Sequence, residues 1–330
     1  MDARFSLSRR AALAGGAGLG LLTACSPTGR GSNSPLAGLT LRVATYKGGV
    51  QSFFQAAGVA DTPYKIAYSE FAGGNLITEA INAKAIDVGS MSEIPPIFAA
   101  RSETLRLIAV LQGDVNNQVT LVPKDSPIRG LADLKGKRVG YVRATTAHFF
   151  LLRLLQEQGL SFADITPIAL SPQDGLAAFG RGALEAWVIY GVQSNLARAR
   201  FAARVLTTAQ GRLSGNYVYA ALKDSIDDPT RRSAIADYLG RVKRAYAWAE
   251  VHPDALASLE AQATGVPAAI YQQQRRERSG PTLLAPVDDA AIRSQQSVAD
   301  VFAQAHLIPA RIDIAPLWDR TFSDGLAREG

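Results

Sequence analysis

After residue 38, over about the first third of the chain, the spacing of hydrophobic residues switches several times between a pattern typical of strands and one typical of helices. Four runs alternate or are short and apolar, which predicts strands over residues 39–45, 64–71, 86–89 and 105–111. Between them the spacing predicts helices over residues 50–57, 76–83 and 93–101. This alternation predicts a parallel sheet with helices on its faces.

A second unit of the same kind follows. After residues 119–123, strands are predicted over residues 137–142, 165–170, 186–190 and 204–208, with helices over 131–136, 145–158, 173–180 and 194–200. The run at 217–221 leads back to the first unit, and from Pro229 onward the pattern is purely helical. The sequence therefore predicts an α/β protein of two lobes, residues 39–122 with 222–330 and residues 123–221. The two lobes are joined by extended crossings near 122–124 and 219–223, and a cleft between them is the natural ligand site.

Composition narrows the function classes. The 330 residues are 47% hydrophobic and 19% charged, which is typical of a globular protein. One Cys and three His exclude a disulfide framework and a cysteine-rich metal centre, so no metal or cofactor is expected. The net charge of +6 is spread out without a run of five Lys or Arg, and no nucleic-acid partner is expected. No catalytic constellation of Ser, His and Asp or of paired carboxylates is recognisable.

The first 38 residues resemble an export signal and a tether. Three Arg, an apolar stretch and small residues predict a signal peptide over residues 1–24. Leu22-Thr23-Ala24-Cys25 resembles a bacterial lipobox, which makes Cys25 the expected lipid attachment site, although an ordinary signal with an incidental Cys is the alternative. Ser8-Arg9-Arg10 resembles a twin-arginine signal. Residues 25–38 read as a lipidated, flexible tether.

Polar turns at the carboxyl ends of the predicted strands mark the cleft. The turn at 143–148 offers Thr hydroxyls, an imidazole and free helix amides, which favour an anionic head group. The alternative is a plain N-cap with a solvated Arg143. Trp187 and Tyr190 could wall the cleft, and core packing is the alternative for Trp187. The candidate binding residues are Tyr46, Lys47, Gly48, Gly74, Asn75, Ser90, Ser92, Glu93, Arg143, Thr145, Thr146, His148, Trp187 and Tyr190.

Several motifs together resemble one family. They include Lys47-Gly48-Gly49, Ile86-Asp87-Val88-Gly89-Ser90, Pro95-Pro96-Ile97-Phe98-Ala99, Leu121-Val122-Pro123-Lys124-Asp125-Ser126-Pro127 and Leu131-Ala132-Asp133-Leu134-Lys135-Gly136-Lys137. In this order, and over roughly residues 38–320, the chain resembles the alkanesulfonate/taurine/nitrate family of periplasmic substrate-binding proteins of ABC importers. The resemblance implies a type II periplasmic-binding-protein fold, which closes on its ligand about two extended hinge segments and docks to a permease.

The resemblance also bears on the ligand. In sulfonate-binding relatives the sulfonate sits at a helix start, which corresponds here to Ala144-Thr145-Thr146. Where relatives often carry Trp-Asp-Pro, this chain has Ile189-Tyr190-Gly191, so a carboxylate is lost and an aromatic ring gained. Aromatic walls suit a larger or aryl tail.

The expected function is capture of an organosulfonate or related sulfur-containing anion by a periplasmic, lipid-anchored and monomeric receptor. Its expected partner is an ABC permease in the inner membrane. The same fold could instead bind nitrate, bicarbonate, a thiamine-precursor pyrimidine or an aromatic carboxylate. A remote alternative is an enzyme, because the fold hosts a pyrimidine-forming enzyme. That enzyme needs a Cys-rich stretch, and Cys25 stands alone in this chain.

Overall fold

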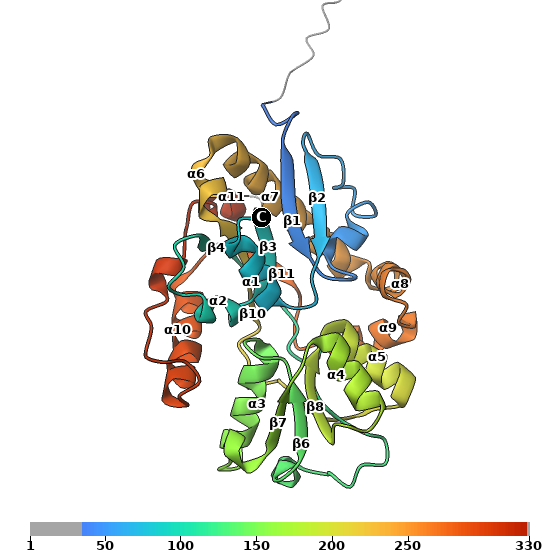
Figure 1. Cartoon of the computed structure of the whole chain (residues 1–330). Helices are drawn as coiled ribbons and strands as arrows, with labels where there is room; N and C mark the ends of the chain where they lie inside the picture. The colour runs from blue at the N-terminus through green and yellow to red at the C-terminus, as the bar shows by residue number, and fades with distance from the viewer. Residues whose placement is uncertain (1–34, 329–330) are drawn as a thin grey trace, which may run out of the picture. The chain divides into compact units, whose positions relative to one another are not determined.

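The computed structural model describes residues 35–328. The predicted signal peptide, the lipobox with Cys25 and most of the tether lie outside the described residues. The described chain forms two mixed β-sheets with helices packed on them (Figure 1). No helix in residues 35–328 has the length and apolar character needed to cross a membrane.

The larger sheet has six strands in the order β11-β4-β10-β3-β1-β2. Its strands are β1 (Thr40–Thr45), β2 (Lys65–Glu70), β3 (Val88–Ser92), β4 (Leu105–Gln112), β10 (Asn216–Leu222) and β11 (Leu283–Ala285). The strands β1 to β4 all run in the same direction, whereas β10 enters antiparallel between β3 and β4, and β11 pairs antiparallel with β4. The predicted parallel direction is therefore correct for β1 to β4, the four strands from which it was made, and the departure is that β10 separates β3 from β4 as an antiparallel neighbour.

Helices cover both faces of this sheet. Leu41 and Val43 of β1 pack toward α7 (Pro229–Val251), whereas Ala44 belongs to the cluster on the opposite face. This is the two-residue period of a strand buried on both sides. The other elements on this sheet are η1 (Val50–Phe53), α1 (Gly74–Asn82), α2 (Pro95–Phe98), α6 (Lys223–Asp227), α8 (Pro253–Thr264), α9 (Ala268–Arg276), α10 (Asp289–Gln304), η4 (Ala315–Leu317) and α11 (Ser323–Arg328). The strand β11 interrupts the region that the pattern predicts as purely helical.

Local sequence sets the helix boundaries. Asp228 accepts hydrogen bonds from the amides of Thr230 and Arg231, and Pro229 occupies the first helical position of α7. The helix α8 begins with Pro253 and ends where Gly265 adopts a left-handed conformation. These caps explain why the helical stretch divides where it does.

The smaller sheet has five strands in the order β7-β6-β8-β5-β9. They are β5 (Gln118–Val122), β6 (Arg138–Tyr141), β7 (Thr166–Ala169), β8 (Ala186–Tyr190) and β9 (Arg204–Thr208). Its helices are η2 (Leu131–Leu134), α3 (Thr146–Glu157), η3 (Phe162–Asp164), α4 (Pro172–Gly180) and α5 (Gly191–Phe201). The strand β5 is antiparallel to both β8 and β9.

The chain passes between the sheets earlier than predicted. The strand β5 belongs to the five-stranded sheet and β10 to the six-stranded sheet, so the connections are residues 113–117 and 209–215. The predicted crossings at 122–124 and 219–223 are wrong because both fall at the far ends of these strands. Sequence alone did not show which sheet each of these apolar runs joins.

Candidate functional site

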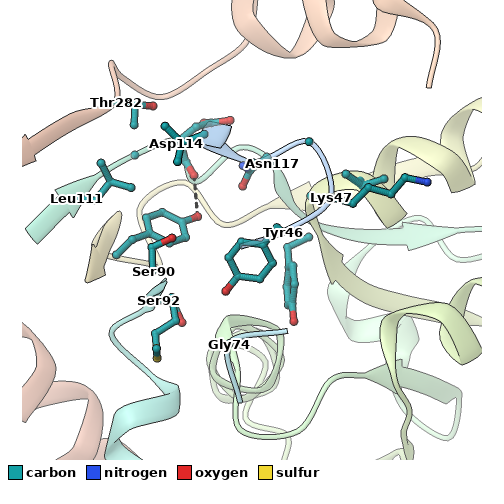
Figure 2. A pocket seen from close by; sticks show the side chains of 18 of the residues that line it. Tyr46, Lys47, Gly74, Ser90, Ser92, Leu111, Asp114, Asn117 and Thr282 are labelled. Carbon is teal, nitrogen blue, oxygen red and sulfur yellow. Dashed lines mark hydrogen bonds between the residues drawn. The ribbon is translucent and has the colours of Figure 1, made fainter. Parts of the chain in front are cut away.

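A cavity of about 550 Å³ is lined by residues from both sheets (Figure 2). From the six-stranded sheet come the carboxyl ends of β1, β2 and β3 and the start of β10, where Tyr217 pairs with Ser92. From the five-stranded side come Gln118, the start of α3 and the end of β8. The strand ends of both sheets thus meet at one cavity, as open α/β sheets arrange their ligand sites.

The helices α1, α3 and α5 begin at the cavity without a side-chain cap, and α5 does so at Gly191. Gly74 opens α1 and Thr146 opens α3, and neither Gly73 nor Thr145 makes a side-chain capping hydrogen bond. The first-turn amides of a helix have no partner within the helix and carry a partial positive charge. The helix starts therefore provide the cavity with groups of donors suited to an anion, one of them from α1 and another from α3.

Two tyrosine hydroxyls approach the start of α1. A Cβ atom at Gly74 would lie 3.3 Å from the Tyr46 hydroxyl, and one at Gly73 would lie 3.3 Å from the Tyr190 hydroxyl. Burial raises the pKa of Tyr190 to about 12 and that of Tyr46 well above its ordinary value, so both phenols stay protonated at neutral pH. The buried Tyr190 hydroxyl has no hydrogen-bond partner among the described residues.

The threonine hydroxyls at the start of α3 already donate within the protein. Thr145 Oγ1 donates to the Val142 carbonyl at 2.7 Å, and Thr146 Oγ1 donates to Gln118 Oε1 at 2.7 Å. Gln118 Nε2 in turn donates to the Tyr217 hydroxyl, which donates to the Asp114 carbonyl. The sequence-based expectation that these hydroxyls serve as anion donors does not fit this arrangement, and the backbone amides remain.

Most charged side chains that line the cavity are paired. Arg278 forms a two-pronged ion pair with Glu250, with distances of 2.9 and 2.6 Å, and Arg275 lies 3.7 Å from Glu260. Burial raises the pKa of Glu260 to about 7. Within residues 35–328, Lys47 has no ion-pair partner and is exposed at the wall. The attraction for an anion therefore comes chiefly from amide and phenol dipoles.

The structure brings together part of the predicted site. The predicted residues that line the cavity are Tyr46, Lys47, Gly48, Gly74, Ser90, Ser92, Thr145, Thr146 and Tyr190. Asn75 on α1 is half-buried but lies outside the lining. Arg143, in the turn before α3, is exposed and does not line the cavity.

Trp187, His148 and Glu93 are core residues and do not line the cavity. Trp187 is fully buried against Phe179, with ring centroids 5.9 Å apart. His148 is packed among aromatic rings, and burial, reinforced by the nearby charge of Arg143, lowers its pKa to about 4, which keeps the imidazole neutral.

Glu93 lies beneath the cavity, directly after Ser92. Its Oε1 accepts hydrogen bonds from Ser214 at 2.5 Å and from Ser294 at 3.3 Å, while Oε2 is buried without a partner. Burial raises its pKa to about 7 despite the Ser214 hydrogen bond. Ser214 belongs to the second connection between the sheets, so Glu93 contacts that connection.

Sequence reasoning missed other lining residues, among them Phe71, Asp114, Gln118, Gln193, Tyr217, Tyr246, Arg275 and Arg278. Phe71 is the last residue of the strand predicted over residues 64–71 and could have been found by the rule that identified its neighbours. The Arg residues come from α9 and from the segment after it, which no local pattern ties to the cleft. Among residues 35–328 no group of three or more His, Cys, Asp or Glu side chains could hold a metal ion.

The two sheets, the two connections and the shared cavity define a periplasmic-binding-protein type of fold. Comparison with known proteins specifies the family: residues 41–256 match the NMT1/THI5-like family model, and the chain belongs to this family. It is 33% identical over 263 residues to a putative aliphatic sulfonates-binding protein of Escherichia coli (strain K12), a match that covers 79% of this chain and 82% of that protein.

Two solved structures are similar to this protein over most of its chain. The periplasmic aliphatic sulphonate binding protein SsuA from Escherichia coli superposes with a TM-score of 0.73 at 31% identity, covering 86% of this chain and 92% of the other. The alkanesulfonate-binding protein SsuA from Xanthomonas axonopodis pv. citri, bound to MOPS, gives a TM-score of 0.77 at 29% identity, covering 86% and 98%. The expected family and fold are therefore confirmed, and the chain is close to solute-binding proteins of this type.

Proposed function

We propose that this protein is the receptor of an ABC importer and captures an organosulfonate. The observation that carries the proposal is the pair of uncapped helix starts, α1 and α3, at one cavity. A sulfonate is a fixed monoanion with three acceptor oxygens, so it requires donors and no acceptor. Backbone amides supply that chemistry, as does the unpartnered Tyr190 hydroxyl.

Binding would occur by closure of the two sheets about residues 113–117 and 209–215. Each sheet contributes one of the helix starts, so a ligand that contacts both stabilises the closed form over the open one. No bond is made or broken in this mechanism. Anchoring through Cys25, export by the predicted signal, action as a monomer and delivery to an inner-membrane permease belong to the same proposal and are supported by the named roles of the relatives.

A thermal-shift panel with the purified protein tests the ligand class. The panel contains methanesulfonate, taurine, benzenesulfonate, sulfate, nitrate, bicarbonate, benzoate and an aminopyrimidine. A ligand at 100 times its Kd stabilises the protein by about 2.7 kcal/mol, which corresponds to a shift of several degrees. We expect shifts with sulfonates. A shift with only nitrate, bicarbonate, benzoate or the pyrimidine would contradict the proposed ligand, and turnover of any compound would contradict a pure receptor.

A further inference from the structure

Four aromatic side chains line the cavity without another ring to pack against. They are Tyr46, Phe71, Tyr190 and Tyr217, all half-buried. None of them takes part in a ring pair within residues 35–328, whereas Phe53 and Tyr246 of the same cavity pair with centroids 5.9 Å apart. One side of each ring packs against a hydrophobic core cluster, and the part of the ring that lines the cavity is available to something that enters it.

These four rings come from different elements and converge. Tyr46 follows β1, Phe71 follows β2, Tyr217 lies in β10 and Tyr190 ends β8. The Tyr46 and Tyr190 hydroxyls both approach the Gly73-Gly74 turn, beside the amides that open α1. All four rings therefore line the cavity that holds the proposed anion site, where a tail could meet them. Figure 2 shows Tyr46 beside Gly74.

The size of the cavity argues against a very small ligand. Sites of about 300–1,000 Å³ hold molecules of drug size, and this cavity has about 550 Å³. Nitrate or a two-carbon sulfonate would leave most of the aromatic wall in contact with water, and it would gain little from closure.

We propose that the ligand carries an aromatic tail, an arylsulfonate, whose ring packs against Tyr46, Phe71, Tyr190 and Tyr217. This inference rests on the sulfonate function proposed above and narrows it. Offset or edge-to-face ring contacts add roughly two- to tenfold in affinity per pair beyond the area buried. A saturated ring of the same size buries similar area without that contribution.

The matched ligands benzenesulfonate and cyclohexanesulfonate test the inference by isothermal titration calorimetry on the full chain. Both carry the same head group on a six-membered ring. We expect benzenesulfonate to bind about tenfold more tightly. Equal affinities, or tighter binding of the saturated analogue, would overturn the aryl preference and leave the sulfonate function standing. Failure of every sulfonate in the panel, aliphatic or aromatic, would overturn both.

Variants of the ring residues test whether the aromatic side chains cause the preference for benzenesulfonate over cyclohexanesulfonate. Tyr190→Leu keeps apolar bulk and removes the ring, so the benzenesulfonate advantage should fall at least threefold, whereas Tyr190→Phe should keep the affinity ratio. Phe71→Leu provides the same test at a second position if Tyr190→Leu folds poorly. Tyr68→Leu is the matched control, because Tyr68 is 39% exposed on β2 and outside the cavity lining. An unchanged ratio in both Leu variants would refute the inference.

Discussion

At the scale of single residues, the side chain and the backbone amide at the start of α3 have different hydrogen-bonding roles. The Thr146 hydroxyl gives its proton to Gln118, a residue 28 positions earlier. Sequence predicts the helix start and its hydroxyls correctly. It does not predict this long-range acceptor, so it could not show that the Thr146 hydroxyl already donates within the protein.

Two substitutions at position 146 separate these roles. Thr146→Ala removes the hydroxyl, and we expect less than a threefold loss of sulfonate affinity. Thr146→Pro also removes the amide proton at the first helical position, where proline is well tolerated and where the preceding Thr145 is already extended. We expect the Pro variant to bind at least tenfold more weakly than the Ala variant by calorimetry, with a retained melting transition. Equal affinities would exclude this amide as a ligand contact.

Glu93 makes a prediction about pH. Its pKa is raised from 4.5 to about 7 in the folded protein, so the native state binds more protons than the unfolded state between these values. Its contribution to stability is therefore complete below pH 4.5 and is lost as pH rises through about 7. The loss amounts to at most about 3 kcal/mol.

Urea unfolding of the wild type and of Glu93→Gln at pH 5, 6, 7 and 8 measures this effect. The wild type should lose more stability over the range than the variant, because the amide does not titrate. Glu260 titrates in the same range in both proteins, so only their difference reports on Glu93. Parallel pH profiles would show that Glu93 has an ordinary pKa.

At the scale of elements, alternating strands and helices were predictable because each has its own hydrophobic period. The pairing of strands was not. The strand β10 inserts between β3 and β4, although more than 100 residues separate it from either in sequence. The same insertion brings Tyr217 to the cavity, so the missed pairing and the missed lining residue have one cause.

The start of α1 depends on close approach to β3. A Cβ atom at Gly74 would lie 2.8 Å from Met91 Cβ and 3.1 Å from Pro95 Cγ. We expect Gly74→Ala to destabilise the protein by about 1–3 kcal/mol and to weaken sulfonate binding, because α1 must shift away from the cavity. Gly38→Ala is the control, since nothing lies within 4 Å of its added methyl group. Chemical unfolding and calorimetry measure both effects, and a Gly74→Ala variant as stable as Gly38→Ala would contradict the packing.

At the scale of the whole described chain, the two sheets are joined by more than their two connections. Phe149 of α3 packs on Phe302 of α10, with centroids 5.4 Å apart. Between a second pair of helices, Asn195 of α5 donates a hydrogen bond to Gln274 of α9 at 2.9 Å. The second of these contacts joins two helices that line the cavity, and closure must preserve or re-form both contacts. Sequence predicted a two-lobed receptor, but it could not show these contacts, which join residues far apart in the chain.

The central claim is that the sulfonate head group binds between the starts of α1 and α3. Anomalous diffraction from the ligand sulfur, in crystals grown with benzenesulfonate, tests it most directly. Our account predicts a sulfur position about 4 Å from the first-turn amide nitrogens of both helices, with the ring beside Tyr46 and Tyr190. A sulfur peak beside Arg275 and Arg278, or outside the cavity, would contradict it.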